Sequence, residues 1–252
     1  MASRVAMVTG ASRGIGAASA LAFAQAGYRV ALAARSAEAL EAVAEKIRAS
    51  GGEALAIPTD VTDLDAVHVL VERTVERFGG LDAAFNNAGG GAPPTPLAEF
   101  DLKTFEATLR DNVVGTFVCM RYQIPEMLKH GGGAIVNMSS TAGLQGVAGL
   151  APYCAGKHAI VGLSKCAALD YAAQNIRVNV VAPGPIGTER IDQRQREHIG
   201  QFVPLQRVGL PEEVGALAVW LCSDSASFIT GAVVPIDGGR LAGTPAFGRR
   251  MP

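Results

Sequence analysis

The stretch TGASRGIG, residues 9–16, joins a short apolar run to a longer run rich in alanine. The apolar run at residues 5–9 predicts a β-strand, and residues 15–26 predict a helix. Glycines at this junction let the backbone turn sharply and leave free N–H groups at the helix start, which favours binding of a dinucleotide pyrophosphate. The spacing is Gly-x3-Gly-x-Gly instead of the usual GxGxxG, and a glycine-rich turn without a ligand is the alternative. The predicted contacts of this turn are Gly10, Ser12, Arg13, Gly14, Ile15 and Gly16.

Short apolar runs alternate with helical ones along the rest of the chain. Further strands are predicted at residues 29–34, 54–58, 81–86, 134–139, 177–182 and 233–236, and further helices at 38–49, 64–78, 102–129, 153–173 and 211–221. The helix at 102–129 is expected to break or bend near Pro125, and residues 183–206 are expected to be irregular. This alternation is typical of an α/β fold, in which a doubly wound parallel sheet binds ligands beyond the carboxyl ends of its strands. We predict one domain over residues 1–240 and a C-terminal tail over 241–252.

The composition limits the partners of the chain. With 252 residues, of which 49% are hydrophobic and 18% charged, the chain can form one large domain. A formal net charge of -1 gives no reason to expect nucleic acid or an anionic membrane as a partner. No run approaches the roughly 18 apolar residues of a membrane span and the N-terminus lacks the apolar region of a signal peptide, so we expect a cytoplasmic protein. The four cysteines show no CxxC pairing and no histidine at ligand spacing, which predicts no metal site.

The end of the second predicted strand bears on which dinucleotide binds. An NAD site commonly places an acid there for the ribose 2′-OH, whereas an NADP site places an arginine near the 2′-phosphate. Here the strand ends in Ala34-Arg35-Ser36, with no acid before Glu38. Arg13 could reach the same phosphate, and arginine pairs with phosphate through charge-assisted hydrogen bonds. We therefore expect NADP(H) in preference to NAD(H), with Arg35 and Ser36 as contacts; a solvated Arg35 is the alternative.

Two short motifs follow the third and fourth predicted strands. Asp60 and Val61 are placed to flank an adenine ring, and NNAG at residues 86–89 brings amides and small residues beside the path of the dinucleotide. Each motif alone is compatible with simple turn chemistry. Because the carboxyl ends of successive parallel strands meet at one edge, the motifs together outline one cleft, with Asn87, Ala88 and Gly89 among its contacts.

Four polar residues form a candidate catalytic group. Tyr153 and Lys157 lie four residues apart on a predicted helix, so they share one face. The ammonium of Lys157, with the positive charge of a nicotinamide nearby, is expected to lower the phenol pKa from about 10, so that Tyr153 can act as acid and base. Ser140 can donate a hydrogen bond to a substrate oxygen that gains negative charge. Asn112 could kink its helix and hold a water that passes protons to Lys157. A YxxxK pair alone is common on helix surfaces, whereas the combination of four residues predicts hydride transfer to or from a carbonyl or alcohol carbon.

These motifs together resemble the short-chain dehydrogenase/reductase family, in its short branch. The resemblance covers residues 5–239 and rests on TGASRGIG at 9–16, NNAG at 86–89, the helix of Asn112, SS at 139–140, YCAGK at 153–157 and PGPIGT at 183–188. It implies that Ser140 binds the substrate oxygen, that Tyr153 transfers the proton and that Lys157 binds the nicotinamide ribose. It also implies a water relay through Asn112, and contacts to the nicotinamide or the phosphates from Pro183, Gly184, Ile186 and Thr188.

The resemblance also bears on architecture and activity. It implies a Rossmann sheet of seven strands in the order 3-2-1-4-5-6-7, a homotetramer or homodimer, and an oxidoreductase similar to 3-oxoacyl carrier-protein reductases or hydroxysteroid and alcohol dehydrogenases. Enoyl reductases of this family space Tyr and Lys more widely. A non-catalytic NADP-binding scaffold or sensor is the alternative, because a fold does not prove activity. The substrate is expected to be a small molecule whose identity the sequence leaves open. Phe247 in the tail is expected to pack against a neighbouring subunit, with a frayed terminus as the alternative.

Overall fold

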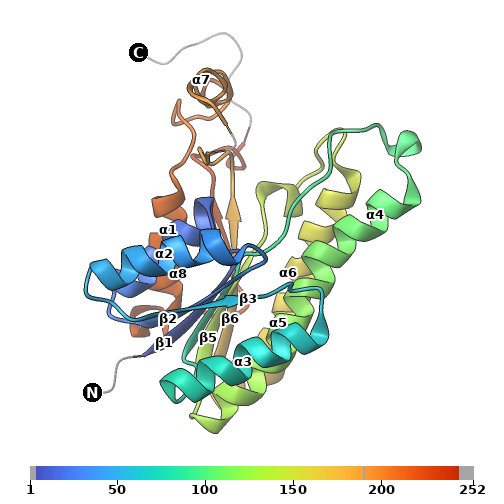
Figure 1. Ribbon diagram of the computed structural model, residues 1–252. Helices are drawn as coiled ribbons and strands as arrows, with labels where there is room; N and C mark the ends of the chain where they lie inside the picture. The colour runs from blue at the N-terminus through green and yellow to red at the C-terminus, as the bar shows by residue number, and fades with distance from the viewer. Residues whose placement is uncertain (1–3, 190, 244–252) are drawn as a thin grey trace.

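A parallel β-sheet forms the centre of the protein (Figure 1). The computed structural model describes residues 4–189 and 191–243. Within these residues the sheet has seven strands in the order β3-β2-β1-β4-β5-β6-β7, and every neighbouring pair is parallel. The strands are β1 (Val5–Thr9), β2 (Arg29–Ala34), β3 (Ala54–Pro58), β4 (Ala83–Asn86), β5 (Gly133–Met138), β6 (Ile176–Pro183) and β7 (Val233–Ile236). The predicted fold, a single doubly wound α/β domain with this strand order, is confirmed.

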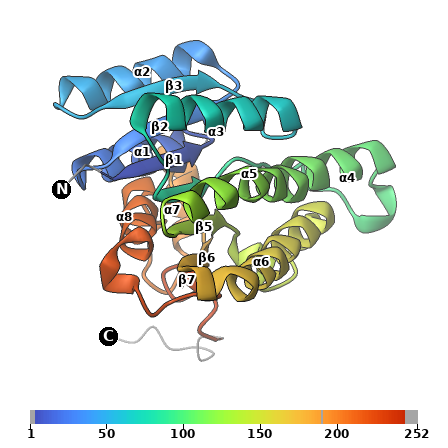
Figure 2. The ribbon, with the colours of Figure 1, turned by 90° about the horizontal axis from the view of Figure 1, so that it is seen from below.

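Helices cover both faces of the sheet. One face carries α1 (Gly14–Gln25), α2 (Ala37–Ala49) and α8 (Pro211–Cys222), and the other carries α3 (Leu64–Phe78), α5 (Gly115–Lys129) and α6 (Ala151–Tyr171). Figure 2 shows α8 and α6 on opposite sides of β5, β6 and β7. Two shorter helices, α4 (Leu102–Leu109) and α7 (Gln193–Gly200), stand beyond the upper edge of the sheet in Figure 1. Short 3₁₀ turns occupy η1 (Leu97–Glu99), η3 (Thr141–Gly143), η4 (Ala172–Gln174) and η5 (Asp224–Ala226).

The strands are buried on both faces, as expected for a parallel sheet between two helix layers. All five residues of β1 are buried. Ala6 and Val8 pack into the apolar cluster on the α1 face, while Met7 packs into the cluster on the α3 face. The strand register then places Thr9 level with Ala33 of β2 and with Asn86 of β4. The motifs that follow these strands therefore begin at one common edge.

A buried polar network links the sheet to the helices of the α3 face. The Asn86 side chain exchanges two hydrogen bonds with Gln123 of α5, at 3.0 and 2.9 Å, and donates another to Asn137 Oδ1 of β5 at 2.9 Å. Asn137 in turn donates to Ser164 Oγ of α6 at 2.9 Å. These four side chains are buried and mutually bonded, which avoids the penalty of burying unpaired polar groups. The network fixes the ends of β4 and β5 relative to α5 and α6.

The long predicted helix is irregular at a different place from the one expected. Pro125 lies inside α5 without ending it, on an exposed side of the helix. An exposed position lets water satisfy the backbone carbonyl that a proline leaves unbonded. The irregularity is instead a π-helical turn, η2 (Arg110–Val114), between α4 and α5. It contains Asn112, the residue expected to kink the helix, and π-helical turns occur frequently at functional sites.

The expectation that residues 183–206 are irregular is wrong in part, because α7 forms there. Asp192 accepts a hydrogen bond from the Gln195 N–H at 2.8 Å, and the Gln195 side chain accepts one from the Asp192 N–H at 2.9 Å. This reciprocal capping satisfies two N–H groups at the start of the helix. Several element boundaries also shift by one or two residues. For example, α6 begins at Ala151, ahead of Tyr153, and β4 begins at Ala83.

The C-terminal tail is described only as far as residue 243. Leu241 N–H donates to Asp237 Oδ2 at 2.7 Å, so the chain just beyond β7 folds back on Asp237. The predicted contact of Phe247 lies outside the described residues, and the division at residue 240 stays a prediction. Among the described residues, no helix combines the length and the apolar character needed to cross a membrane.

Candidate active site

The glycine-rich turn between β1 and α1 has the geometry predicted for it. Gly10 and Gly14 adopt φ of 65° and 53°, a region that glycine enters without strain. A Cβ atom at Gly16 would overlap the Gly10 carbonyl oxygen, so the turn closes only with glycine at this position. The turn leads directly into the N-terminus of α1, where free N–H groups and the helix dipole favour an anion. The residues present therefore fit a dinucleotide pyrophosphate.

Thr9 joins the ends of β1 and β4, a role that the sequence analysis missed. Its hydroxyl oxygen accepts hydrogen bonds from the N–H groups of Asn87 and Ala88, both at 3.1 Å. The Asn87 amide donates back to the Thr9 carbonyl oxygen at 3.0 Å. The structure thus holds the predicted NNAG contacts against the glycine-rich turn. Because Thr9 is the first residue of the TGASRGIG motif, its position was visible in the sequence, but its partner was not.

The residues predicted to select the dinucleotide lie beside the same turn. Ala11 N–H donates to the Ala33 carbonyl oxygen at 3.1 Å, which brings the turn to the end of β2. Arg13 and Arg35, on either side of this contact, are both exposed. Ser36 caps α2 by accepting a hydrogen bond from the Ala39 N–H at 3.4 Å. Two guanidinium groups therefore border the part of the edge where a ribose phosphate is expected.

Asp60 and Val61 follow β3 as predicted, and their surroundings are now defined. Asp60 Oδ1 accepts hydrogen bonds from the N–H and the hydroxyl of Thr62, both at 2.9 Å. The Thr62 N–H is the main cause of a lowered Asp60 pKa, and the charges of Arg35 and Arg110 lower it further. Val61 packs on Gly115, where a Cβ atom would lie only 2.8 Å from Val61 Cγ2. Arg110, which the sequence analysis did not single out, thus belongs to this end of the site.

The predicted catalytic side chains converge at the start of α6. Lys157 is 3% exposed, and its Nζ lies 5.5 Å from the centre of the Tyr153 ring. Lys157 Nζ donates to the Met138 carbonyl oxygen at 2.9 Å, and Ser139 Oγ donates to the Lys157 carbonyl oxygen at 2.9 Å. Tyr153 shares a hydrogen bond with the Ser140 side chain. The end of β5 and the first turns of α6 therefore form one rigid unit that carries Ser140, Tyr153 and Lys157.

The pKa values of this pair differ from the sequence expectation. Burial raises the pKa of Tyr153, and the hydrogen bond with Ser140 opposes this rise without cancelling it. Burial also lowers the pKa of Lys157 to about 7. Because both shifts disfavour the charged forms, the chain by itself does not lower the phenol pKa. Lowering the pKa of Tyr153 would require additional positive charge close to the phenol.

Asn112 lies where a water relay was predicted. Its amide nitrogen donates to the carbonyl oxygens of Gly90 and Thr108, at 2.6 and 2.8 Å. Its Oδ1 atom is buried and has no hydrogen-bond partner among the described residues. A Cβ atom built at Gly89 would lie 2.6 Å from Asn112 Oδ1 and 3.6 Å from Lys157 Nζ. An unpartnered acceptor near the lysine ammonium fits a bound water, since buried polar groups are otherwise paired.

The segment that begins at the end of β6 carries the last four predicted cofactor contacts. Pro183 ends β6, and Gly184 N–H donates to the Ile236 carbonyl oxygen at 3.0 Å. Ile186 is buried and bridges to Gly209, so it anchors this segment. Thr188 reaches back to the glycine-rich turn, where its Cγ2 would lie 3.2 Å from a Cβ atom at Gly14.

The predicted contacts therefore form a continuous row along the edge of the sheet. Arg35 and Asp60 stand at one end and Pro183 to Thr188 at the other, with the turn between β1 and α1 in the middle. This is the layout of an extended dinucleotide whose two halves bind on either side of the central strand.

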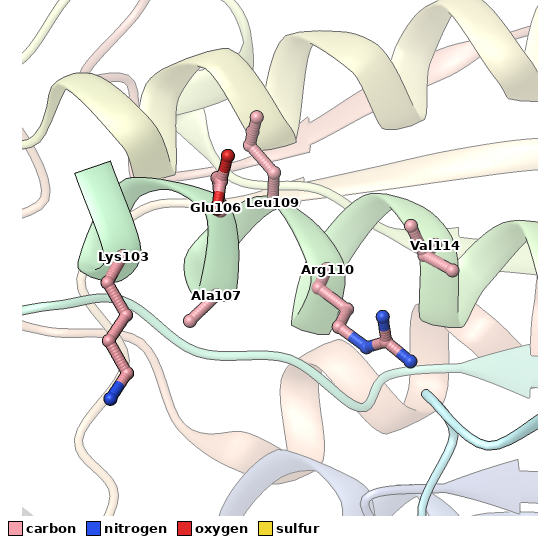
Figure 3. Close-up of a pocket in the computed structure, with 6 residues that line it drawn as sticks. All are labelled: Lys103, Glu106, Ala107, Leu109, Arg110 and Val114. Carbon is pink, nitrogen blue, oxygen red and sulfur yellow. The ribbon is translucent and has the colours of Figure 1, made fainter.

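A separate surface pocket lies on α4 and the π-helical turn (Figure 3). Its volume is about 490 Å³, and its lining is Lys103, Glu106, Ala107, Leu109, Arg110 and Val114. Lys103 and Arg110 project from the same side of the helix in Figure 3. Among these residues, Arg110 is the one that affects a predicted cofactor contact, because its charge lowers the pKa of Asp60. Within residues 4–189 and 191–243, no cluster of His, Cys, Asp or Glu could hold a metal ion.

Known proteins resemble this chain in sequence and structure. A family model described as enoyl-(acyl carrier protein) reductase matches residues 10–240. An A-factor type γ-butyrolactone 1′-reductase from Streptomyces virginiae is 43% identical, over 94% of this chain and 95% of that protein. A 3-oxoacyl-[acyl-carrier-protein] reductase from a Synechocystis species is 41% identical, over 94% and 96%. A short-chain type dehydrogenase/reductase from Mycobacterium marinum has a superposable structure, with a TM-score of 0.91, 36% identity and coverage of 96% and 97%.

These similarities extend over nearly the whole chain. The chain therefore belongs to the short-chain dehydrogenase/reductase family and is an NAD(P)-dependent oxidoreductase that acts on alcohol or carbonyl groups.

Proposed function

We propose that the protein reduces a small carbonyl compound, or oxidises the matching alcohol, with NADP(H) as cofactor and Tyr153 as the acid/base. The observation that carries the proposal is the contact of Tyr153 with Ser140 and with the buried Lys157, beside the glycine-rich turn. The pyrophosphate would bind at Gly10, Ser12, Arg13, Gly14, Ile15 and Gly16. The adenosine half would bind at Arg35, Ser36, Asp60 and Val61, and the nicotinamide half at Asn87, Ala88, Gly89, Tyr153, Lys157, Pro183, Gly184, Ile186 and Thr188.

The residues of the chain supply the proton chemistry. When bound, the nicotinamide exchanges a hydride with the substrate carbon. Ser140 and Tyr153 orient the substrate oxygen between two hydroxyl groups, and Tyr153 delivers a proton to that oxygen during reduction. The raised pKa of Tyr153 keeps the phenol protonated until then. Lys157 then passes a proton back to Tyr153, and the unpartnered Asn112 Oδ1 holds the water that resupplies Lys157.

The charges beside β2 support NADP(H) over NAD(H). Ala34 closes the strand where an NAD site has an acid, and Arg35 follows it on the surface. Arg13 follows Ala11 by two residues, as Arg35 follows Ala33, and Ala11 is hydrogen-bonded to Ala33. Two guanidinium groups without a carboxylate at position 34 favour a 2′-phosphate over a free 2′-hydroxyl.

The outer surface of α5 supports a homo-oligomer, either a tetramer or a dimer. Val114, the last residue of η2, and Phe117 and Leu128 of α5 are 37%, 46% and 39% exposed, and helical spacing places them on one side of the helix. The neighbouring α6 exposes Leu169 to 82%. A monomer rarely leaves such an apolar surface in water, and a second copy of the same chain is the commonest partner for it.

Removing the phenol hydroxyl tests the acid/base assignment. Tyr153→Phe keeps the ring and removes the proton donor, so turnover with NADPH should fall by about 10²-fold or more. Binding of NADPH, followed by fluorescence titration, should stay within about 3-fold of the wild type because no cofactor-binding charge changes. A variant that keeps near-normal turnover would show that another group moves the proton.

Exchanging the charges at the end of β2 tests cofactor choice. Ala34→Asp combined with Arg35→Ala adds a ribose acceptor and removes a phosphate partner, so the ratio of kcat/KM for NADPH over NADH should fall by about 10-fold or more. Lys46→Ala serves as the control, since Lys46 lies in the last helical turn of α2, at the opposite end from Arg35 and Ser36. Tighter binding of NADH than of NADPH by the wild type at matched ionic strength would contradict the NADP(H) proposal.

The burial of Lys157 predicts a pH-dependent stability. Its pKa falls from 10.5 in the unfolded chain to about 7 in the folded one. Between these values the unfolded chain holds a proton that the folded chain has released, so the free energy of unfolding rises with pH in this window. Relative to Lys157→Met, the cofactor-free wild type should therefore gain stability in urea titrations between pH 7 and pH 10. The exposed Lys165→Met should show a flat difference, and a flat difference for Lys157→Met as well would refute the buried, easily deprotonated lysine.

A charge placed on the apolar side of α5 tests the oligomer. Phe117→Glu should lower the mass measured by sedimentation velocity to that of a smaller species, because it buries a carboxylate between copies. Val69→Glu is the matched control, since Val69 is 44% exposed on α3 and is not one of the residues that define this surface. An unchanged mass for Phe117→Glu, or a wild type that already sediments as a monomer, would rule out this surface as an interface.

A further inference from the structure

Three consecutive glycines pass through the catalytic group. Asn112 Oδ1 and Lys157 Nζ face Gly89, as described above, and the Gly90 carbonyl oxygen accepts the hydrogen bond from Asn112. A Cβ atom at Gly91 would lie 3.4 Å from Tyr153 Cδ2, and its three nearest atoms would all belong to Tyr153. Gly89 thus borders Asn112 and Lys157, Gly90 borders Asn112, and Gly91 borders Tyr153. Gly91 is exposed, so without a side chain it leaves this flank of the Tyr153 ring uncovered.

The loop that continues from Gly91 is fastened to the loop that follows Ser140. Thr95 N–H donates to the Gly149 carbonyl oxygen at 2.9 Å. A Cβ atom at Gly149 would lie 3.1 Å from Pro94 Cβ, so the two backbones touch. These two loops, residues 90–96 and 141–150, both precede Tyr153 in the sequence and meet beside it in space. They form a wall for whatever molecule presents its carbonyl to Tyr153 and Ser140.

This wall carries no charge. Residues 86–98 and 138–156 contain no Asp, Glu, Lys, Arg or His. The nearby α7 contributes Arg196, but its guanidinium donates to the carbonyl oxygens of Ile191 and Thr188 at 3.1 and 2.9 Å. Arg196 therefore secures the segment after β6 and is already engaged. An anionic substrate group would lose its hydration against this wall without meeting an opposite charge.

We propose that Gly91 is a specificity-determining position, and that the substrate is an uncharged ketone or secondary alcohol with a ring or a bulky apolar group beside the reacting carbon. The inference rests on the proposed function of Tyr153. The uncovered flank of the Tyr153 ring receives that apolar group, and the neutral loops bury the remainder of the molecule. Small ketones use the same hydroxyl groups but leave the space beside Gly91 empty.

The position can be changed without backbone strain. Neither Gly91 nor Gly162 of α6 has a positive φ, so both tolerate a side chain. A side chain at Gly91 would contact the Tyr153 ring, whereas one at the exposed Gly162 would meet nothing within 4 Å. Gly162→Val is therefore a control of equal size without contact to the catalytic group.

The test compares cyclohexanone with butan-2-one, using NADPH and the full-length protein. Gly91→Val should lower kcat/KM for cyclohexanone by about 10-fold or more, the scale of a steric clash in an apolar pocket. The same variant should keep butan-2-one within about 3-fold of the wild type. Gly162→Val should leave both substrates near wild-type values. An equal loss for both ketones would mean that Gly91 merely positions Tyr153, and unchanged cyclohexanone reduction would also overturn the proposal.

A second comparison tests the neutral wall. The wild type should use cyclohexanone with a kcat/KM at least about 10-fold higher than 4-oxocyclohexanecarboxylate, which differs by one carboxylate. Equal or better use of 4-oxocyclohexanecarboxylate would refute an uncharged substrate. NADPH binding without turnover of any of these ketones would also refute it.

Different results would contradict the proposed function itself: a wild type that binds no dinucleotide, or a Tyr153→Phe variant that retains turnover.

Discussion

Parallel pairing in register brings the ends of all seven strands to one edge, and the site depends on this alignment. Thr9 shows how closely the alignment is held. Its hydroxyl accepts two N–H groups from the segment after β4, so the glycine-rich turn and the NNAG motif cannot move apart independently. The predicted adenine side, the turn and the predicted catalytic side then follow in strand order along the edge. A dinucleotide is long enough to span such a row, so the proposed contacts from six separate segments are compatible with one ligand.

A second level of order comes from polar groups inside the core. Asn86 and Asn137 lie on adjacent strands, and Gln123 and Ser164 bring α5 and α6 to them. Because an unpaired amide in this environment is unfavourable, the four side chains define one relative position of strands and helices. Asn86 immediately precedes the cofactor segment, and Asn137 lies three residues before Ser140. The network therefore positions the two halves of the active site without touching the ligand.

Burial disfavours the charged forms of both Tyr153 and Lys157. It raises the pKa of Tyr153 and lowers that of Lys157 to about 7. The backbone at Gly89 lies over this pair so closely that a Cβ atom there would be 2.6 Å from Asn112 Oδ1 and 3.6 Å from Lys157 Nζ. In the proposed mechanism, a positive charge that enters with a ligand would shift the pair toward the phenolate.

Most of the fold was decided by patterns that are local in the sequence. Strand–helix alternation and the TGASRGIG turn predicted the sheet, because backbone turning and burial of β-strands depend on near neighbours. The YxxxK spacing likewise placed Tyr153 and Lys157 on one side of a helix. The same local reasoning failed at Pro125 and at α7. In the first case water can satisfy the freed carbonyl. In the second, the capping box of Asp192 and Gln195 starts a helix, although the glycines and the proline of this segment had indicated an irregular chain.

Contacts between distant segments required the tertiary structure. No sequence spacing relates Thr9 to Asn87, Gly91 to Tyr153 or Thr95 to Gly149, because these pairs meet only after the strands have aligned. The pKa direction of Tyr153 was also decided at this level. Sequence reasoning counted the charge of Lys157 four residues away, whereas burial of both groups has the larger effect. The sequence alone determined which chemical groups the protein has and which local elements carry them; the packing of the whole chain determined how far each group is removed from water, and hence its charge.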